Sequence, residues 1–509
     1  MKKIRKWIKR HPVRTKRALE IIPGVTSWFL ILFPVWGSFV IPEIVAYYII
    51  GFSVYWFYRS MTTAALATLG YFKLKSYQAY DWMADVKLFP DWQKIQHIVV
   101  IPTYKEPIST LRRTLEHLGK QTFPTSKIHI MLSFEDREGE AARAKALELS
   151  QEFEGVFGDL WATYHPDLPG EVKGKSSNTS WGAKEAKRIL VDEKKIEIDY
   201  VTITSEDADV LLNEQYFACL TYHFLDNPER YQLIWQAVLM FYNNIWRVPL
   251  PVRVFSSIAS VMQLYVVTRK DRLINFSTYS ASLAMIDAIG YWDVDVIPED
   301  WRLFFKAFFK MDGKVRVEPL FLPINADAAE SRGVMKTLYS QYEQVKRWAW
   351  GVSDTPYIVE KWIMSDNVPF WEKTIRVLRV LEDHFLWPVN WFAITLGALL
   401  PPLLNKEFSR TIIGKTLPQV TSGILTLCLV ALFAIIILNF RLRPKRDGRR
   451  IPILTPLWEV LEFITMPVIG FFFTALPGID AHTRLMLGKY IEYKVTEKVA
   501  PRDGEVKNE

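Results

Sequence analysis

The amino-acid sequence predicts an α/β domain with an open, mostly parallel sheet, inserted between transmembrane helices. Long segments almost free of charged residues lie near both ends of the 509-residue chain. Between them, short apolar runs alternate with helical patterns. Uncharged stretches of about 20 residues are long enough to cross a bilayer, and alternating strands and helices are typical of a parallel sheet covered by helices.

Composition agrees with a chain that is part soluble and part lipid-embedded. Half of the residues are apolar, and 19 Trp, 22 Tyr and 31 Phe exclude a disordered chain. The net charge is +8, but nine Lys and Arg fall within residues 1–17 and six within 441–450, beside apolar segments. Such clusters mark cytoplasmic ends of membrane helices, so we expect no nucleic-acid partner. The two cysteines, Cys219 and Cys428, predict neither a disulfide framework nor a zinc site.

Residues 1–72 are expected to contain the basic N-terminus and two membrane helices. Residues 21–41 carry no charge and cover the roughly 30 Å hydrocarbon core as a helix. A cleaved signal peptide is excluded because the stretch is too long and no small-residue cleavage site follows it. Residues 44–70 carry only Arg59 and are rich in Tyr and Trp, which favour membrane interfaces.

Residues 371–480 are expected to hold two or three more membrane segments. Residues 385–404 and 419–440 are each about long enough to span. Prolines and two glutamates interrupt residues 451–479, which predicts either an interfacial, broken or re-entrant segment or a fifth span. Residues 374–384 have apolar positions at helical spacing, as in an amphipathic helix on the membrane surface or a soluble helix packed on the domain.

Topology follows from counting the spans. With the basic N-terminus inside, an even number of crossings leaves both residues 73–370 and the basic stretch 441–450 in the cytosol. We therefore expect an integral protein of a bacterial-type cytoplasmic membrane, with the lipid bilayer as a partner. Between about residues 75 and 370 we expect no segment long and apolar enough to span.

The middle region has the rhythm of an open α/β sheet. Residues 97–102, 127–133 and 200–204 are short apolar runs, as expected for buried parallel strands. Helical patterns follow at 108–119, 139–154 and 176–191. In such folds, ligands bind beyond the carboxyl ends of the strands.

Polar and acidic residues follow each of these three strands. They are Thr103, Tyr104 and Glu106 after the first, Glu135 and Asp136 after the second, and Glu206, Asp207 and Asp209 after the third. Carboxylates that converge on one crevice repel one another unless a cation offsets their charge, and Mg²⁺ or Mn²⁺ prefers such oxygen ligands. An Asp-x-Asp pair alone is weak evidence, because a solvated turn produces it by chance, but its position after a strand strengthens it.

Two further elements can take part in chemistry. The loop 169–178 is basic and opens a helix, where backbone N–H groups and Lys175 can receive phosphate charge, although a surface loop is the simpler interpretation. Glu299 and Asp300 precede a helical run and can either cap the helix or supply a general base.

In this order, the motifs resemble glycosyltransferase family 2, and within it the membrane-integrated branch of cellulose and hyaluronan synthases. Four elements carry the resemblance: VVIPTYKEP at 99–107, EDAD at 206–209, PED at 298–300 and QVKRW at 344–348. The resemblance implies that residues 73–370 form a cytosolic domain of the GT-A type, which binds a nucleotide sugar. It departs from the usual pattern at SFEDRE after the second strand and at Pro298.

The resemblance also implies roles for particular residues. Thr103, Tyr104 and Glu106 would hold the nucleotide base, assisted by Glu135 or Asp136. Asp207 and Asp209 would bind the diphosphate and its Mg²⁺ or Mn²⁺, and Asp300, beside Glu299, would be the general base. Gln344, Arg347 and Trp348 would contact the diphosphate and stack on an acceptor sugar.

The cytosolic tail, residues 481–509, contains a weaker element. YKVTEK is similar to the F-x-V-T-x-K gating loop of cellulose synthases, which would assign Tyr493, Val495, Thr496 and Lys498 to a lid over the active site. The first position is Tyr rather than Phe.

Together these features predict a metal-dependent, inverting hexosyltransferase that acts in polysaccharide biosynthesis. It would move a sugar from a nucleotide-diphosphate donor, expected to be UDP-linked, to a growing polysaccharide at the cytoplasmic face and export the product through its own helices. Transfer of one sugar to a lipid-linked acceptor is the alternative. An inactive membrane scaffold is a third possibility, but the presence of Asp207, Asp209, Asp300 and Trp348 speaks against it. No protein partner is predicted.

Overall fold

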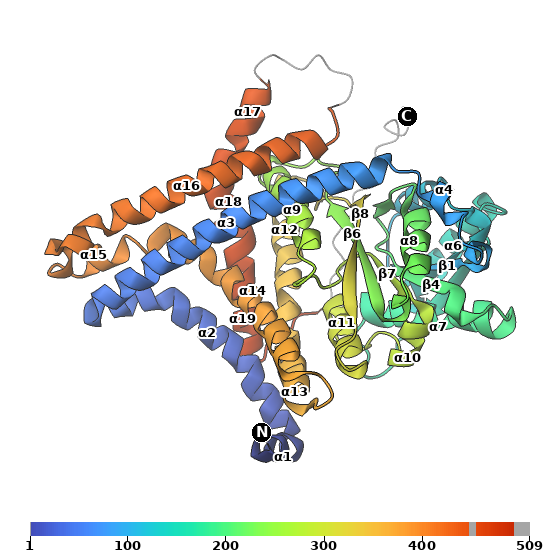
Figure 1. Ribbon diagram of the computed structural model, residues 1–509, viewed down its shortest axis with the longest axis horizontal. Helices are drawn as coiled ribbons and strands as arrows, with labels where there is room; N and C mark the ends of the chain where they lie inside the picture. The colour runs from blue at the N-terminus through green and yellow to red at the C-terminus, as the bar shows by residue number, and fades with distance from the viewer. Residues whose placement is uncertain (1, 447–454, 493–509) are drawn as a thin grey trace.

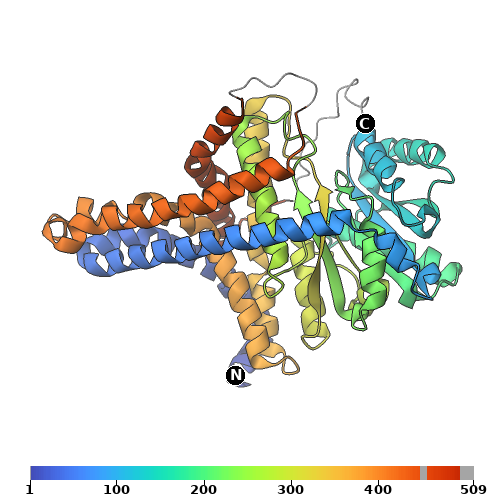
Figure 2. The same ribbon diagram turned by 45° about the horizontal axis from the view of Figure 1, so that its top comes forward.

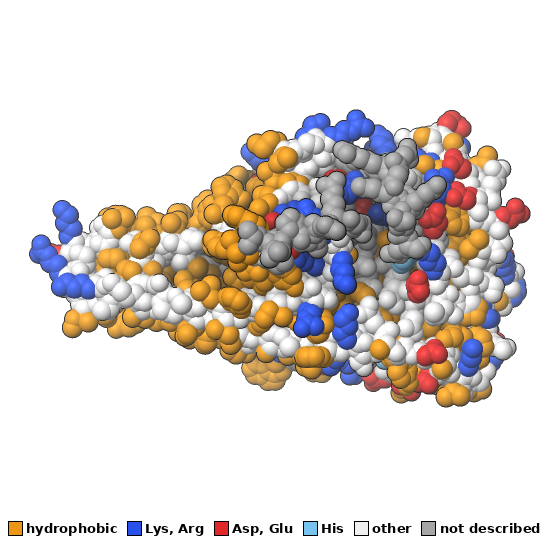
Figure 3. All heavy atoms as spheres, turned by 90° about the horizontal axis from the view of Figure 1, so that it is seen from above, with side chains coloured by type: hydrophobic (Ala, Val, Ile, Leu, Met, Phe, Trp, Pro, Cys, Tyr) orange, Lys and Arg blue, Asp and Glu red, His pale blue; other side chains and the backbone are white. Residues whose placement is uncertain are grey.

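A computed structural model describes residues 2–446 and 455–492 of the protein. An α/β domain forms one end of the molecule, and long helices extend from it to the other end (Figure 1). The space-filling view shows apolar side chains gathered along the narrow helical end, whereas acidic side chains concentrate on the wide end (Figure 3). This division matches the expected soluble and lipid-embedded parts.

Eight strands form one sheet in the order β3-β2-β1-β4-β7-β6-β8-β5. The strands are β1 (Gln96–Thr103), β2 (Ile128–Glu135), β3 (Asp159–His165), β4 (Val201–Ser205), β5 (Leu211–Leu212), β6 (Leu233–Met240), β7 (Tyr279–Ser282) and β8 (Arg316–Asn325). The run β3-β2-β1-β4 is parallel, but β7 is antiparallel to both β4 and β6, and β5 is antiparallel to β8. The expectation of an open, mostly parallel sheet is therefore corrected: the sheet is mixed.

The three strands expected from the sequence, at 97–102, 127–133 and 200–204, are confirmed as β1, β2 and β4. They were recognisable because both faces of the sheet are covered there, so nearly every side chain is buried and apolar residues recur along each strand. The four residues of β7, Tyr-Ser-Ala-Ser, carry no apolar run. Strand β7, whose antiparallel pairing makes the sheet mixed, could therefore not be predicted from hydrophobic periodicity.

The helices of the domain are, in chain order, α4 (Trp82–Val86), α5 (Ile108–Leu118), α6 (Glu140–Glu152), α7 (Lys175–Lys187), α8 (Tyr216–Asp226), α9 (Leu250–Thr268), α10 (Leu283–Ile289), α11 (Glu299–Lys310), α12 (Val334–Ala349) and α13 (Thr355–Met364). The three helical patterns expected at 108–119, 139–154 and 176–191 are confirmed as α5, α6 and α7. Helix α7 packs on β1 and β2, and α9 packs on β6. The contacts of α7 fix its start relative to the sheet.

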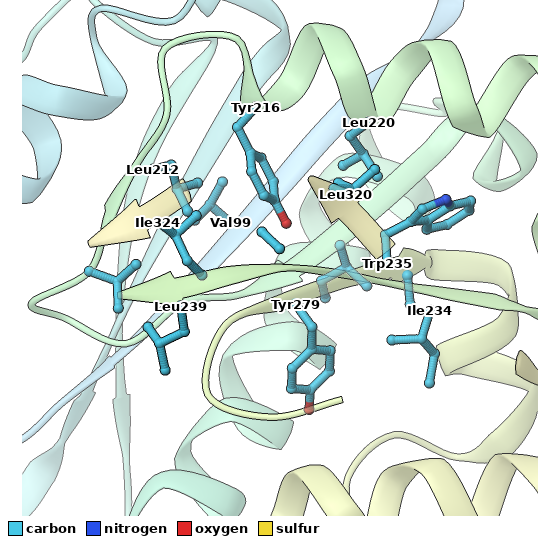
Figure 4. Packing of buried hydrophobic residues seen from close by; sticks show 14 of the residues in the cluster. Val99, Leu212, Tyr216, Leu220, Ile234, Trp235, Leu239, Tyr279, Leu320 and Ile324 are labelled. Carbon is cyan, nitrogen blue, oxygen red and sulfur yellow. The ribbon is translucent and has the colours of Figure 1, made fainter. Parts of the chain in front are cut away.

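The sheet carries the core of the domain. Trp235, Tyr216 and Tyr279 are among the largest side chains that are fully buried, and Tyr216 and Tyr279 lie on opposite faces of the sheet (Figure 4). An aromatic side chain of this size buries about 150–250 Å², so each contributes about 4–6 kcal/mol of transfer free energy at about 25 cal/mol per Å². Core packing on both faces makes the sheet a rigid base for the residues at its edge.

The remaining helices are α1 (Lys2–Arg10), α2 (Pro12–Val40), α3 (Pro42–Ala79), α14 (Phe370–Leu396), α15 (Leu400–Leu404), α16 (Ile412–Leu442), α17 (Thr455–Leu461), α18 (Met466–Gly470) and α19 (Leu476–Leu487). In the described part of the chain, four helical segments are long and apolar enough to cross a membrane: α2, α9, α16 and the run Leu457–Leu487. Helices α2 and α16 contain the expected spans 21–41 and 419–440.

Two of the expected spans, residues 44–70 and 385–404, differ from the expectation. Residues 44–70 lie within α3, whose 38 residues make a helix of about 57 Å that runs beside α16 (Figures 1 and 2). Residues 385–404 do not form one helix, because α14 ends at Leu396 and α15 starts at Leu400, where two prolines follow. Neither is among the four segments above.

The expectation that nothing between residues 75 and 370 is long and apolar enough to span is wrong by length and composition, because α9 qualifies. Helix α9 packs against β6, α3 and α16. Burial between the sheet and the long helices therefore explains the apolar composition of α9 as well as contact with lipid would.

The segment 451–479, which the sequence left open, falls largely within the run Leu457–Leu487. This run consists of short α, 3₁₀ and π pieces. In both ribbon views it lies crosswise to α3 and α16 (Figures 1 and 2). If α3 and α16 cross the bilayer, this orientation favours an interfacial or broken segment over a fifth span.

Residues 374–384 form part of α14. Trp371, Ile375 and Leu378 expose 72%, 44% and 58% of their surface along one side of this helix. An exposed apolar stripe favours the membrane-surface interpretation over a helix packed on the domain.

Candidate active site

Five side chains from four elements meet beyond the carboxyl ends of β1 and β4. Asp207 follows β4, Lys175 begins α7, Ser277 precedes β7, and Glu299 and Asp300 begin α11. The parallel strands and the helix starts bring these residues to one edge of the sheet, as open α/β folds bring ligand-binding residues together. The sequence named four of the five.

Lys175 is at the centre of this cluster. Its Nζ lies 2.8 Å from Asp207 Oδ1 and 3.1 Å from Glu299 Oε1, and it donates to the carbonyl of Ser277 at 2.7 Å. Burial alone would lower the pKa of Lys175, but the charges of Asp207, Glu299 and Asp300 outweigh it and hold that pKa well above its ordinary value. The lysine is therefore a fixed cation among carboxylates.

Asp300 accepts two backbone hydrogen bonds. Its Oδ2 accepts from Ser277 N at 3.0 Å and its Oδ1 from Trp301 N at 2.8 Å. Burial raises the pKa of Asp300, while Lys175 and the two N–H groups oppose that shift. Burial likewise raises the pKa of Glu299, again opposed by Lys175. Glu299 and Asp300 occupy the first turn of α11. They can therefore stabilise the start of this helix and also face the cluster around Lys175.

The residues expected to hold the nucleotide base lie at the ends of β1 and β2. Thr103 is buried, and its carbonyl accepts from Asn178 Nδ2 at 3.4 Å. The guanidinium of Arg137 stacks 3.8 Å from the centre of the Tyr104 ring, and Arg137 Nε donates to Glu135 at 2.5 Å. Glu106 is also buried, next to this loop.

Glu135 and Asp136 point to different places. Glu135 is buried and lines a small cleft at the ends of β2 and β3 together with Arg137, His165, Asp167, Lys173 and Ser177. The side chain of Asp136 is 48% exposed and pairs with Arg143 at 2.9 Å. Of the two acids left open by the sequence, Glu135 lines a cleft and Asp136 faces solvent.

Asp207 and Asp209 differ in their surroundings. Asp207 accepts from Ser277 Oγ at 2.6 Å in addition to pairing with Lys175. Asp209 is buried, and its Oδ2 accepts from Asp327 N at 3.3 Å. No group of three or more His, Cys, Asp or Glu among the described residues can hold a metal by itself. Two carboxylates do fit Mg²⁺ or Mn²⁺ that binds together with a diphosphate, because phosphate and water complete its coordination.

Glu206 does not belong to the crevice. Its side chain is fully buried, and neither carboxyl oxygen has a hydrogen-bond partner among the described residues. Burial raises the pKa of Glu206 well above its ordinary value, and the neighbouring Asp207 raises it further. The expectation that all acids of EDAD converge on one crevice is therefore corrected: the side chain of Glu206 lies in the core.

We predict that Glu206→Gln raises the melting temperature at pH 8. Because burial raises the pKa of Glu206, this side chain ionises above about pH 4.3 in the unfolded chain but only at higher pH in the folded protein. The unfolded state therefore binds fewer protons, and stability falls as pH rises through that range. The amide removes this cost, which adds about 2–4 °C for each kcal/mol regained. Thermal unfolding in detergent at pH 5 and pH 8 checks this; a gain no larger at pH 8 than at pH 5 contradicts it.

The QVKRW residues lie on α12 but do not share one environment. Gln344 and Arg347 line a cavity of about 790 Å³ between α12 and α19, together with Lys336, Tyr339, Ser340, Tyr342, Glu343, Lys346, Asp480, Arg484, Tyr490, Ile491 and Glu492. Trp348 instead packs against Phe241 and Phe255, with ring centres 5.7 and 6.3 Å away. The gating residues Tyr493, Val495, Thr496 and Lys498 lie outside the described residues.

Ser277, Arg137 and His165 were not expected from the sequence. Ser277 precedes a strand that had no apolar signature, and His165 ends β3, whose residues are only partly buried. Arg137 lies within SFEDRE, two residues after Glu135. A basic residue among acids could have indicated an ion pair at this position.

No protein-family model and no curated protein matches the chain significantly. Among solved structures, a mannosyltransferase from Pyrobaculum calidifontis in complex with GDP-Man and Mn²⁺ is similar over 77% of this chain and 99% of its own, with 13% identity and a TM-score of 0.41. S. aureus TarS 1–349 in complex with UDP-GlcNAc is similar over 79% and 94%, with 15% identity and a TM-score of 0.34. GalNAc-T7 with UDP, GalNAc and Mn²⁺ is similar over 59% and 56%, with 12% identity and a TM-score of 0.31. Scores this low assign no family.

Proposed function

We propose that the chain is a membrane-integrated, inverting glycosyltransferase of the family 2 type. It transfers a sugar from a nucleotide-diphosphate donor, UDP-linked in our proposal, to a growing polysaccharide at the cytoplasmic face. The observation that carries this proposal is the partly buried cluster of Lys175, Asp207, Glu299 and Asp300 at the carboxyl ends of parallel strands. A cation, a diphosphate-binding acid and a candidate base stand there together.

Each side chain has a part in the proposed transfer. Asp300 takes the proton from the acceptor hydroxyl, whose oxygen attacks the anomeric carbon as the bond to the diphosphate oxygen breaks, so the configuration inverts. Lys175 offsets the charge that develops on the leaving diphosphate. Asp207 and Asp209 would hold Mg²⁺ or Mn²⁺, which supplies Lewis-acid stabilisation of the same diphosphate.

The ionised form of Asp300 is supported by its contacts. A general base must hold no proton before the reaction, and burial works against that. Lys175 and the two backbone N–H groups of Ser277 and Trp301 favour the carboxylate instead. The same groups that position Asp300 therefore prepare it to accept a proton.

The nucleotide base would lie at the ends of β1 and β2, on Thr103, Tyr104, Glu106 and Glu135. Glu135→Gln should weaken donor binding about tenfold, because a buried carboxylate that accepts from a base N–H loses a charged hydrogen bond. Asp136→Asn is the matched control, since Asp136 is exposed and pairs with Arg143. Donor KM values for the two variants check this; equal effects would argue against Glu135 as the base ligand.

Export through the helices is supported by α14. His384 Nε2, Trp387 Nε1 and Asn390 Oδ1 are buried without a hydrogen-bond partner among the described residues, and they recur every three residues. The ring of Trp301, next to Asp300, lies 5.1 Å from that of His384. Hydroxyl groups of a sugar chain would satisfy such atoms, so we propose that the product passes along this side of α14 from the active site.

The acceptor would also meet α12. The cavity beside Gln344 and Arg347 presents both charged groups and tyrosine rings, which suit a hydroxyl-rich chain. Trp348 would need to leave its contacts with Phe241 and Phe255 to stack on a sugar. We therefore assign acceptor contact to Gln344 and Arg347 first.

Membranes containing the protein, incubated with radiolabelled nucleotide sugars and Mg²⁺ or Mn²⁺, test the proposal when the product is sized. A long polymer supports processive synthesis. A single labelled sugar extractable with lipid would replace it with the lipid-linked alternative. Absence of any transfer from every donor would leave the inactive scaffold.

A further inference from the structure

We propose that Ser277 is the positioning residue of the active site, which holds the general base, the buried lysine and the diphosphate-binding aspartate in register. This inference rests on the proposed function. No sequence motif singled out Ser277. We infer that it affects donor binding through its hydroxyl group and turnover through its backbone N–H group.

All three polar groups of Ser277 are used, each for a different partner. Its backbone N donates to Asp300 Oδ2 at 3.0 Å. Its carbonyl accepts from Lys175 Nζ at 2.7 Å, and its Oγ donates to Asp207 Oδ2 at 2.6 Å. One residue thus contacts three of the charged groups to which transfer is assigned.

The backbone of Ser277 makes this possible. Its φ is +57°, in the left-handed region that residues with a side chain rarely adopt. Glycine would adopt this conformation without cost, so the serine side chain adds only the hydroxyl contact with Asp207. Such local strain persists where the surroundings fix the backbone, which is common at functional sites.

The surroundings of Ser277 do fix it. Asn275 Nδ2 donates to the carbonyl of Asp300 at 2.9 Å, and Phe276 N donates to Gln236 Oε1 at 2.8 Å. On the other side, Thr278 Oγ1 accepts from Asp207 N at 3.1 Å. The loop is therefore tied to α11, to β6 and to the end of β4, so the position of Ser277 sets the spacing of the site.

The contacts predict separable effects. The hydroxyl acts on Asp207, so its loss should weaken binding of the diphosphate and metal. The backbone N–H acts on Asp300, so a side chain that forces the backbone out of the left-handed region should slow turnover. β-branched residues resist this region most strongly.

Four residues at position 277 separate these effects. Ser and Gly can both keep the left-handed backbone and differ in the hydroxyl, whereas Thr and Val both resist this backbone and differ in the same hydroxyl. The variants are Ser277→Gly, Ser277→Thr and Ser277→Val. The control is Ser282→Ala, in β7, because Ser282 is buried but its Oγ has no hydrogen-bond partner among the described residues.

Binding of UDP and of GDP with Mn²⁺ is measured by calorimetry on the purified full-length protein, and kcat with the active donor. We expect Kd to rise about 10-fold or more from Ser to Gly and again from Thr to Val, since a hydrogen bond to a charged group is lost. We expect kcat to fall about 10-fold from Ser to Thr, with Gly close to wild type. A purely structural role would lower the active fraction without this split between Kd and kcat.

Wild-type protein that binds and transfers, together with Ser277→Gly that binds the nucleoside diphosphate like wild type, would overturn the inference. If Thr and Val fail to fold, the Ser–Gly comparison still decides it. Wild-type protein that binds no nucleoside diphosphate at all would instead remove the proposed function, and the inference with it.

Discussion

Asp300→Asn should abolish sugar transfer while leaving donor binding within a few-fold of wild type. An amide cannot take the proton of the acceptor hydroxyl, and a general base contributes about 10²–10⁴-fold to rate. Lys175 remains paired with Asp207 and Glu299 in the variant, so the groups assigned to the diphosphate keep their arrangement. We therefore expect kcat to fall by about 100- to 10,000-fold, the scale of that base contribution.

The control for this variant is Asp295→Asn. Asp295 lies in the same loop, five residues before Asp300, and is exposed. Its kcat should stay within about two-fold of wild type, as surface substitutions have small effects. An Asp300→Asn protein that transfers sugar at a rate comparable to wild type would remove Asp300 from the role of base.

The second large effect is expected from Lys175→Met. Lys175 and Glu299 keep only 9% and 7% of their side-chain surface exposed. Removing the cation leaves the carboxylates of Asp207, Glu299 and Asp300 next to one another without its charge. Breaking a buried ion pair in this way costs about 3–5 kcal/mol, so we expect a marked loss of stability together with loss of donor binding.

Two further variants separate stability from function. Glu299→Gln in the Lys175→Met background removes one uncompensated charge, so it should recover part of the melting temperature but no transfer. Lys184→Met is the control, because Lys184 lies on the same helix, α7, but is exposed and lines neither the cleft nor the cavity described above. Thermal unfolding and donor titration distinguish the variants; unchanged stability of Lys175→Met would show that the carboxylates do not depend on this cation.

The part of the fold that periodicity predicts is the part covered on both faces. Strands β1, β2 and β4 are buried at almost every position because helices shield them from solvent, and apolar residues recur along each of them. The short strand β7 pairs through its backbone between β4 and β6, and its serines and alanine carry no hydrophobic pattern. Its antiparallel direction depends on the long return through α9, which local sequence does not encode.

The site shows the same limit. Lys175, Asp207 and Asp300 were predictable because each begins a helix or ends a strand with a charge that needs a partner. Ser277 was not, because its role comes from a backbone angle and from three partners that are remote in sequence. Glu206 was misplaced because strand alternation turns successive side chains to opposite faces, and the EDAD motif spans both.

The helices also show where composition alone misleads. Helix α9 is as apolar as a span because it is covered by β6, α3 and α16. Helix α3 carries Arg59, which pairs with Asp383 of α14 at 3.3 Å. Charge inside a long helix is tolerated where a partner from another helix lies beside it, and such pairing becomes visible only in three dimensions.

Release of nucleoside diphosphate from a nucleotide sugar tests the central claim most directly. The purified full-length protein is incubated with UDP- and GDP-sugars and Mn²⁺, with Asp207→Asn as the paired sample. We expect release and transfer of the sugar from at least one donor by wild type, and loss of both with Asp207→Asn and after chelation of the metal. A wild-type protein that neither binds nor cleaves any of these donors would contradict the account.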